Sequence, residues 1–255
     1  MKSVSSVCGA LAIGIAATLL QVQPSTAQTY NWTGLYFGAH VGGAWSSSNA
    51  TDVLDPAGGY FTNGFGDTFS FDSSGVAGGG QIGYQFQFGR WVLGAEVAGT
   101  WPDLLDRHES PFYPGSDRVE MRISPILTAT ARLGYALGDR WLAYVKGGYA
   151  GADVDLRAYD SVGDVGLAGT SNWLSGYTVG AGLEYALYEG VRIGVDYAYI
   201  DLPSETFAAQ TTLGAPERFD TSAEIHTVTA RINFQLGRSE PAYEPRYEPR
   251  YEPLK

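Results

Sequence analysis

The residues best suited to chemistry lie close together between positions 103 and 110, where the chain carries Asp103, Asp106, His108, Glu109 and Ser110. A histidine beside a carboxylate can act as a general base, and neighbouring carboxylates can bind a cation weakly through oxygen. Exposed loops carry the same residue types for solubility, and nothing else in the segment sets a catalytic geometry. We therefore expect no catalytic residue, no metal ligand and no enzyme activity. The alternatives are an enzyme whose active site this segment forms at the rim of the fold, and a weak cation site.

A second set of polar residues consists of charged side chains that stand singly between apolar residues. They are Glu96, Glu120, Arg122, Arg132, Lys146, Glu184, Arg192, Asp196 and Arg231. Charges in a narrow, poorly hydrated interior must be paired, because an uncompensated buried charge is costly. Two interpretations stay open for this set: a structural salt-bridge network that plugs an interior, and the constriction of a narrow pore for small solutes.

Charged side chains that stand singly between apolar ones need a secondary-structure element with one polar and one apolar face. Residues 32–45 show which kind of element this is. Leu35, Phe37 and Val41 fall on one face of the segment, and Tyr36 and His40 fall on the other. This period of two is typical of a β-strand. A strand usually has about 5–6 residues, whereas this one reaches the length of about 9–11 residues that a tilted strand needs to cross a bilayer.

Seven further segments repeat this alternation. They are residues 76–88, 91–101, 119–135, 141–152, 177–187, 191–199 and 227–234. Long polar segments at 46–74, 102–118, 153–173 and 202–222 alternate with tight turns at 89–90, 137–140 and 189–190. Outer-membrane barrels sort their connections in this way, with short periplasmic turns and long extracellular loops. The predicted fold is all-β: an eight-stranded antiparallel up-and-down transmembrane β-barrel whose first strand pairs with its last. Pro125 cannot donate to a strand ladder, so a bulge is expected there.

The alternation also fits a soluble barrel of lipocalin type with its apolar face inward. Eight strands, however, leave an interior barely wide enough for side chains, and the apolar face is bulky at nearly every position. Aromatic residues near the strand ends resemble interfacial girdles; they are Trp45, Phe88, Trp91, Trp101, Tyr135, Trp141, Tyr185, Tyr199 and Phe234. We therefore prefer the membrane barrel, with His40 as a hydrogen-bonded interior residue rather than a haem ligand. No cofactor is expected.

Residues 1–27 have the features of a secretory signal peptide. Lys2 gives a positive start, an apolar run follows from 7 to 20, and Ser25 and Ala27 are small residues at a cleavage site. Cys8 lies inside this segment, so the predicted barrel domain, residues 28–237, has no cysteine for a disulfide. Loss of Lys2 takes the net charge from −11 to −12, which disfavours nucleic-acid binding.

Residues 32–38, Trp-Thr-Gly-Leu-Tyr-Phe-Gly, follow shortly after this signal. They resemble the start of the small alphaproteobacterial outer-membrane β-barrel porin family (Omp25- and Omp31-like), which is related to the opacity and OmpA-like eight-stranded barrels. The matching N-terminal motif residues are Trp32, Gly34, Tyr36 and Gly38, and further matches lie at 131–135, 144–150, 184–185 and 196–199. The resemblance implies an integral outer-membrane protein, exported by the Sec route, with surface loops. Members are abundant envelope and surface-antigen proteins, and some are described as porins or as haem-binding.

The chain departs from this family at its C-terminal end. Family members usually end on an aromatic residue that the barrel-assembly machinery reads, here Phe234, but this chain continues and repeats Tyr-Glu-Pro at 243–245, 247–249 and 251–253. Proline at every fourth position favours an extended, polyproline-like chain. Residues 238–255 are therefore expected to be a disordered periplasmic tail. Two interpretations stay open: an inert extension, and a tether to peptidoglycan or a periplasmic protein.

The sequence thus predicts a cell outer-membrane protein of a Gram-negative bacterium, with a structural, envelope-integrity and surface-antigen function. Its lumen is expected to be plugged by charged side chains. The first alternative is a narrow porin-like channel for small solutes. A less favoured alternative is a rim enzyme or a haem or metal binder. The expected partners are outer-membrane lipid, lipopolysaccharide and the barrel-assembly machinery, and nucleic acid is not among them.

Overall fold

The computed structural model describes residues 30–53, 68–109, 117–160, 165–166, 170–210 and 216–236. Every regular element within these ranges is a strand. None of the described residues belongs to a helix long and apolar enough to cross a membrane. The predicted signal peptide, residues 1–27, and the predicted tail, residues 238–255, lie outside the described residues.

Eight long strands form the wall, and two short strands extend it. The elements are β1 (Gly34–Asp52), β2 (Thr68–Phe88), β3 (Trp91–Pro102), β4 (Leu104–Glu109), β5 (Asp117–Leu137), β6 (Trp141–Asp160), β7 (Val165–Gly166), β8 (Thr170–Tyr188), β9 (Val191–Gln210) and β10 (Pro216–Leu236). β4 follows β3 after a break at Asp103, and β7 is a two-residue strand paired with β6. Every pairing is antiparallel.

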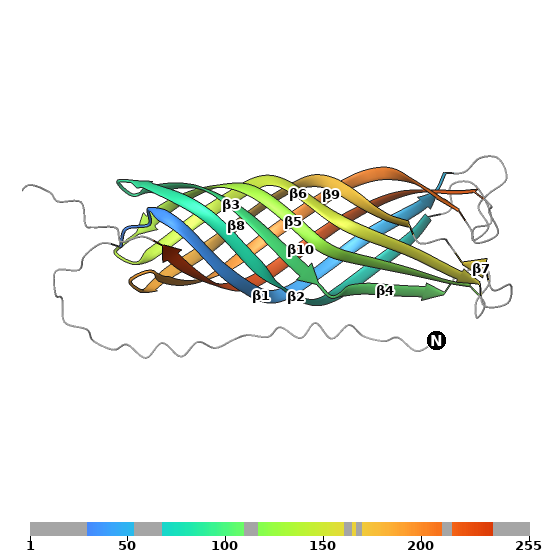
Figure 1. The fold of residues 1–255 in the computed structure, drawn as a ribbon, viewed down its shortest axis with the longest axis horizontal. Helices are drawn as coiled ribbons and strands as arrows, with labels where there is room; N and C mark the ends of the chain where they lie inside the picture. The colour runs from blue at the N-terminus through green and yellow to red at the C-terminus, as the bar shows by residue number, and fades with distance from the viewer. Residues whose placement is uncertain are drawn as a thin grey trace, which may run out of the picture.

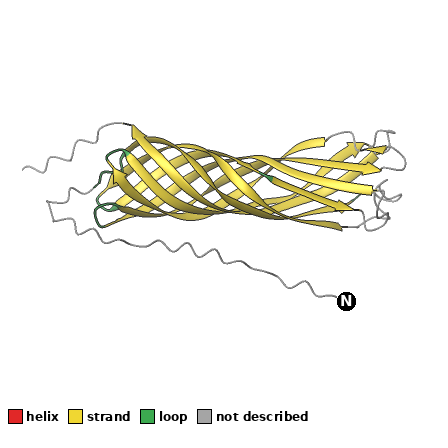
Figure 2. Cartoon of the chain, turned by 90° about the horizontal axis from the view of Figure 1, so that it is seen from below, coloured by secondary structure: helices red, strands yellow, loops and turns green. Residues whose placement is uncertain are grey.

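The sheet closes on itself (Figures 1 and 2). Its strand order is β4-β5-β3-β2-β1-β10-β9-β8-β6-β7, and a further pairing of β5 with β6 joins the two sides. The predicted pairing of the first strand with the last is confirmed: Phe37 lies opposite Phe234, and Val41 lies opposite Ala230. The prediction of an eight-stranded antiparallel barrel is therefore confirmed.

Tight turns join the strands at one end of the barrel, which is the periplasmic end. Gly89, Gly138 and Gly190 lie in these turns with φ of 60°, 62° and 77°. Glycine reaches this left-handed region at no steric cost, because it has no Cβ. The three turns lie where the sequence predicts them.

The long polar segments are mostly strand, so the predicted loop boundaries are wrong. Residues 46–52, 68–74, 104–109, 153–160, 170–173, 202–210 and 216–222 all continue the wall. Alternation persists there but its polarity is inverted, because the inward side chains are now mostly apolar and the outward ones mostly polar. In β10, for example, Ile225 is buried while Glu224 is exposed. This inverted alternation differs from that of the lipid-facing half of each strand, so the sequence pattern did not identify these residues as strand.

The inverted half of the wall encloses an apolar core. We call this half the collar; it comprises residues 46–52, 68–76, 104–109, 117–124, 151–160, 170–176, 200–210 and 216–225. Its core includes Phe71, Leu104, Met121, Ile123 and Leu202, which are at most 3% exposed. An apolar interior with a polar exterior is what a water-exposed barrel requires. We infer that the collar projects beyond the membrane on the extracellular side.

A register shift in β5 decides which way its side chains face. The ladder with β6 shifts between Ile123 and Ile126, around the cis Ser124–Pro125 bond, so the bulge expected at Pro125 is confirmed. A one-residue shift moves every later side chain to the opposite face. Met121 and Ile123 are therefore buried on one side of the shift, and Ile126 is buried on the other.

The prediction that Glu120 and Arg122 lie in the lumen is wrong for this reason. Both precede the shift, where the outward face carries the even-numbered residues, and Arg122 is exposed. Arg132 follows the shift and is buried. The pattern of the sequence runs on through Pro125 without a break, so it assigns all three residues to one face.

Candidate functional site

The barrel interior holds seven charged side chains at the level of the lipid-facing wall. They are Glu96, Arg132, Lys146, Glu184, Arg192, Asp196 and Arg231, from six different strands, and their side chains are between 0% and 10% exposed. Each stands at an inward position of an alternating strand. The structure therefore brings together seven of the nine predicted lumen charges. We call these seven residues the charge network.

Arg132 lies at the centre of the charge network. Its Nη1 atom is 3.1 Å from Oε2 of Glu96, and its Nη2 atom is 2.6 Å from Oε1 of Glu184. The guanidinium also lies 3.8 Å from the ring centroid of Tyr144. One arginine thus neutralises two carboxylates and stacks on an aromatic face, which is the combination that a planar guanidinium serves best.

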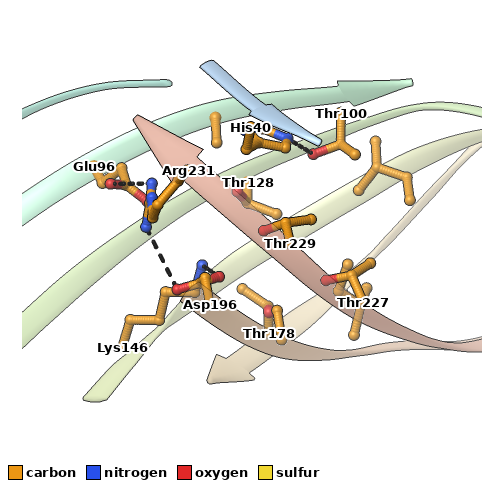
Figure 3. Close-up of a pocket in the computed structure, with 14 residues that line it drawn as sticks. His40, Glu96, Thr100, Thr128, Lys146, Thr178, Asp196, Thr227, Thr229 and Arg231 are labelled. Atoms are coloured by element: carbon orange, nitrogen blue, oxygen red, sulfur yellow. Dashed lines mark hydrogen bonds and ion pairs between the residues drawn. The ribbon is translucent and has the colours of Figure 1, made fainter. Parts of the chain in front are cut away.

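Arg231 links Glu96 to a second carboxylate on the far side (Figure 3). Its Nη2 donates to Glu96 at 2.8 Å, and its Nη1 lies 3.4 Å from Asp196. Lys146 approaches the other oxygen of Asp196 at 2.5 Å. Both carboxylates therefore face two cations each.

Two tyrosines extend the network. The Tyr36 hydroxyl donates to Glu96 at 2.7 Å and accepts from Arg132 at 2.6 Å. The Tyr144 hydroxyl donates to Asp196 at 2.6 Å and accepts from Arg231 at 2.8 Å. A hydroxyl that both donates and accepts satisfies a carboxylate and a guanidinium at once.

Amide side chains continue the network toward both ends of the barrel. Gln85 accepts from Arg192 at 2.6 Å, and Gln81 donates to Asn233 at 2.7 Å. His40 lies 2.7 Å from Oε1 of Gln81 through Nδ1 and 3.0 Å from Oγ1 of Thr100 through Nε2. The structure thus places His40 in the interior with both ring nitrogens in hydrogen bonds, which leaves neither free for a ligand.

A small cavity lies next to the network on its collar side. Its volume is about 40 Å³, and its lining includes His40, Lys146, Arg231 and threonines from several strands. Figure 3 shows Thr128, Thr178, Thr227 and Thr229 gathered beside the charged row. A cavity needs roughly 10–15 Å³ to hold one water molecule, so this one has room for about three. Its polar lining suits water, and the space is too small for a solute much larger than that.

The charges of the network pair with one another. The network has four cations and three carboxylates, and every carboxylate lies within 3.4 Å of two cations. Within the described ranges, no group of three or more His, Cys, Asp or Glu side chains could hold a metal ion. The chemistry that the arrangement supports is mutual neutralisation.

Trp32 seals the periplasmic end, a role that sequence reasoning missed. It is 1% exposed and packs with Val92 and Leu142. Its backbone N–H donates to Oε1 of Gln87 at 2.8 Å, and its ring lies 5.5 Å from the guanidinium of Arg192. The parity that Trp32 shares with Tyr36 and His40 was a signal of its inward position. That signal does not predict that residues 30–33 fold into the mouth of the barrel.

Residues 30–33 are held in this position by several hydrogen bonds. The Tyr30 N–H donates to the carbonyl of Asp139 at 2.9 Å, and the Tyr30 hydroxyl donates to Gln235 at 2.8 Å. Gln235 in turn donates to the carbonyl of Thr33 at 2.6 Å. We call residues 30–33 the periplasmic seal.

Replacing Trp32 with alanine should destabilise the barrel by about 3–5 kcal/mol, because it removes a fully buried indole and leaves a cavity. Urea unfolding of the refolded protein in lipid vesicles measures this effect. Trp101→Ala is the control, because Trp101 is 58% exposed on the outer wall. Equal effects from the two substitutions would contradict the assignment of Trp32 as a buried seal.

The structure shows what each residue of the N-terminal family motif contacts. Trp32 closes the mouth and Tyr36 joins the charge network. Gly34, at φ 146°, lies where the seal turns into β1. A Cβ on Gly38 would lie 2.1 Å from the carbonyl oxygen of Ile232. The four positions therefore set the start of β1 and its approach to β10.

The segment that first suggested catalysis belongs to the collar wall. Asp103 is exposed at the break before β4, and Asp106, His108 and Glu109 lie in that strand. Nothing is described of the last three side chains, and Ser110 lies outside the described residues.

The model of the outer membrane protein beta-barrel domain family matches residues 12–234. The chain belongs to this family. It is similar to the 31 kDa outer-membrane immunogenic protein of Brucella melitensis, at 27% identity over 239 residues, covering 87% of this chain and 92% of the relative. It is also similar to the 25 kDa outer-membrane immunogenic protein of Brucella canis, at 26% identity, covering 81% and 87%.

Solved barrels show the same fold. The structure is similar to that of OprG from Pseudomonas aeruginosa, with a TM-score of 0.50, 14% identity, and coverage of 82% of this chain and 99% of that one. The outer membrane protease OmpT from Escherichia coli gives a TM-score of 0.53 at 8% identity, covering 85% and 99%. At these identities the likeness concerns the fold alone. The barrel family member described here is a protein of the Gram-negative outer membrane.

Proposed function

We propose that this protein is a non-conducting structural barrel that supports the outer membrane and presents a rigid collar at the cell surface. One observation carries the proposal, which is the layered filling of the interior. From the periplasmic side, the layers are the seal around Trp32, the charge network, the small polar cavity and the apolar core of the collar. A solute would have to break every layer in turn.

The charge network opposes conduction for an electrostatic reason. An ion moving through it would have to separate pairs such as Arg132 and Glu184, whose side chains are at most 1% exposed. Leaving a buried charge without its partner costs about 3–5 kcal/mol. An aqueous channel of the porin kind also needs about 16–18 strands.

The apolar core of the collar opposes conduction for a different reason. Phe71, Leu104 and Ile225 are nearly inaccessible and offer no hydrogen bonds to a hydrated solute. Burying a polar group without a partner costs about 1–3 kcal/mol on protein scales. A solute would have to pass both the charge network and the apolar core of the collar, and together these two barriers support a closed lumen.

The collar supports the surface function. β5 and β10 each have 21 residues, and at about 3.3 Å per residue and a tilt near 40° such strands span roughly 50 Å along the barrel axis. The apolar band of an outer-membrane barrel is about 25 Å tall. Roughly half of the wall therefore stands outside the membrane as a rigid surface. The relatives named above are immunogenic outer-membrane proteins, and a rigid exposed surface of this kind suits antibody recognition.

The proposal includes no catalytic function, and it assigns the outer wall to lipid and lipopolysaccharide. Aromatic pairs lie where the wall meets the membrane boundary near the turns, such as Trp91 with Tyr135 and Trp141 with Tyr185, at centroid distances of 5.1 Å and 4.7 Å. Amphipathic aromatic rings favour that boundary. Recognition by the barrel-assembly machinery, and a tether role for residues 238–255, remain proposals of the same kind.

Planar-bilayer recording of the refolded mature chain tests the closed lumen. We expect no resolvable current steps from the wild type, and none from the protein cut after residue 237. Lys146→Met is the diagnostic variant, because Asp196 keeps Arg231 as a partner. Current steps whose ion selectivity changes in Lys146→Met would establish a narrow pore and overturn the proposal.

A further inference from the structure

The cavity on the collar side of the charge network has a lining rich in hydrogen-bond donors. Lys146 and Arg231 reach it from the network. An ammonium group has three donors, and the contact of Lys146 with Asp196 uses one of them. Threonine hydroxyls line the other sides (Figure 3), among them those of Thr128, Thr227 and Thr229. We call this space, of about 40 Å³, the polar cavity.

Two carboxylates also border the polar cavity, and cations compensate both of them. Glu96 lies within 3.1 Å of Arg132 and Arg231. Asp196 lies within 3.4 Å of Arg231 and Lys146. Taken together, these five groups are three cations and two carboxylates, so this half of the network carries one positive charge in excess.

The rest of the interior does not remove this excess. Glu184 and Arg192, the other two charges of the network, lie 3.4 Å apart and cancel. Between the periplasmic seal and the apolar core of the collar, every inward position of the wall is described, and these positions carry no Asp, Glu, Lys or Arg outside the network. Protonation of His40 would only increase the excess. Because a buried charge without a partner is costly, the interior favours one further negative charge.

Unpaired donors in the same interior also favour an anion. Among the described residues, Nε of Arg132, Nε of Arg231, and both Nε and Nη2 of Arg192 are buried without a hydrogen-bond acceptor. Against them stands one buried carboxylate oxygen of the network without a donor, Oε2 of Glu184. Buried polar atoms of this kind are commonly met by an ordered water or an ion. Water satisfies a donor but leaves the excess charge, whereas an anion removes both deficits.

We propose that the polar cavity binds one small monovalent anion of the halide class, held between the Lys146 ammonium and the threonine hydroxyls. The size of the cavity selects the ion. A halide is a sphere little larger than a water molecule and fits a space with room for about three waters, whereas the four oxygen atoms of a sulfate or phosphate do not. The proposal goes beyond the structural function and is independent of it, because an ion held in a closed cavity carries no current.

Urea unfolding of the refolded mature chain in lipid vesicles tests the site through its effect on stability. Sodium gluconate replaces sodium chloride at constant ionic strength, because gluconate is too large for the polar cavity. An anion that binds the folded barrel alone raises the ratio of folded to unfolded protein. Above the dissociation constant of the site, we expect each tenfold rise in chloride to raise this ratio about tenfold.

Three variants separate a bound anion from a general effect of salt. Lys146→Met removes the excess charge and should abolish the dependence on chloride. Thr229→Val removes one donor of the lining at unchanged charge, and it should raise the chloride concentration at which stabilisation begins by about tenfold. Thr130→Val is its control, because Thr130 is also buried in the interior but lies outside the lining of the polar cavity. This control should respond to chloride as the wild type does.

Bromide locates the ion directly. The chain is refolded in sodium bromide, so that the ion can enter before both ends of the lumen close, and crystals should then show an anomalous scattering peak beside Nζ of Lys146. Crystals of Lys146→Met should show none there.

Two outcomes would overturn the proposal. One is a dependence on chloride that the wild type shares equally with Lys146→Met and Thr229→Val. The other is bromide on the outer surface alone, which is an adventitious ion only. A bromide peak in the polar cavity together with current steps in planar bilayers would support the anion site and overturn the closed lumen, so the two proposals fail separately.

Discussion

Replacing Arg132 with methionine should lower the free energy of unfolding by about 3–5 kcal/mol, the usual cost of removing one partner from a buried ion pair. Arg132 is the shared partner of Glu96 and Glu184. After the substitution Glu184 keeps Arg192 at 3.4 Å, and Glu96 keeps Arg231 at 2.8 Å. Neither contact replaces the bridge that Arg132 makes between the two carboxylates, so both become under-compensated in the barrel interior.

Urea unfolding in lipid vesicles measures the effect of Arg132→Met, and the same strand offers a matched control. Arg122→Met makes the same substitution in β5 before the register shift, where the side chain is exposed, and it should change stability by less than about 0.5 kcal/mol. Adding Glu184→Gln to Arg132→Met should recover part of the loss, because it removes one uncompensated charge. If Arg122→Met proved as costly as Arg132→Met, the assignment of opposite faces would be wrong.

Gly42→Ala should lower the fraction of molecules in which the barrel closes. A Cβ on Gly42 would lie 1.9 Å from the carbonyl oxygen of Val228 and 2.7 Å from Cα of Thr229. Both are backbone atoms of β10, so relief requires β1 and β10 to separate at the line where the barrel closes. Overpacking of a core typically costs about 1–3 kcal/mol. Because the contact here is with backbone atoms, which cannot move aside as a flexible side chain can, we expect a cost at or above the upper end of this range.

The neighbouring residue gives the control for Gly42→Ala. A Cβ on Gly43 meets nothing within 4 Å, so Gly43→Ala should fold as the wild type does. Electrophoresis with and without boiling measures the folded fraction, because a folded barrel migrates differently from the unfolded chain. A folded fraction that is the same for both alanine variants would contradict the close approach of β1 and β10.

The amino-acid sequence by itself determined the strands, the turns and the closure of the barrel. Alternation from Leu35 onward is a local property of a pleated chain, since successive side chains point to opposite faces. Tight turns at Gly89, Gly138 and Gly190 are equally local, because they need a residue that tolerates positive φ. An even number of such strands, joined alternately by short and long connections, leaves the pairing of β1 with β10 as the way to satisfy both edges.

Only the tertiary structure decided which face is inside, and where. Alternation defines two faces, but the solvent outside the wall selects which one turns inward, and that solvent changes from lipid to water along each strand. The alternation in the sequence therefore predicted loops where the structure has the strands of the collar. Likewise the shift at Pro125 moved Glu120 and Arg122 outward, because register depends on the neighbouring strand. The seal by Trp32 also depends on partners far away in the chain, which no local pattern contains.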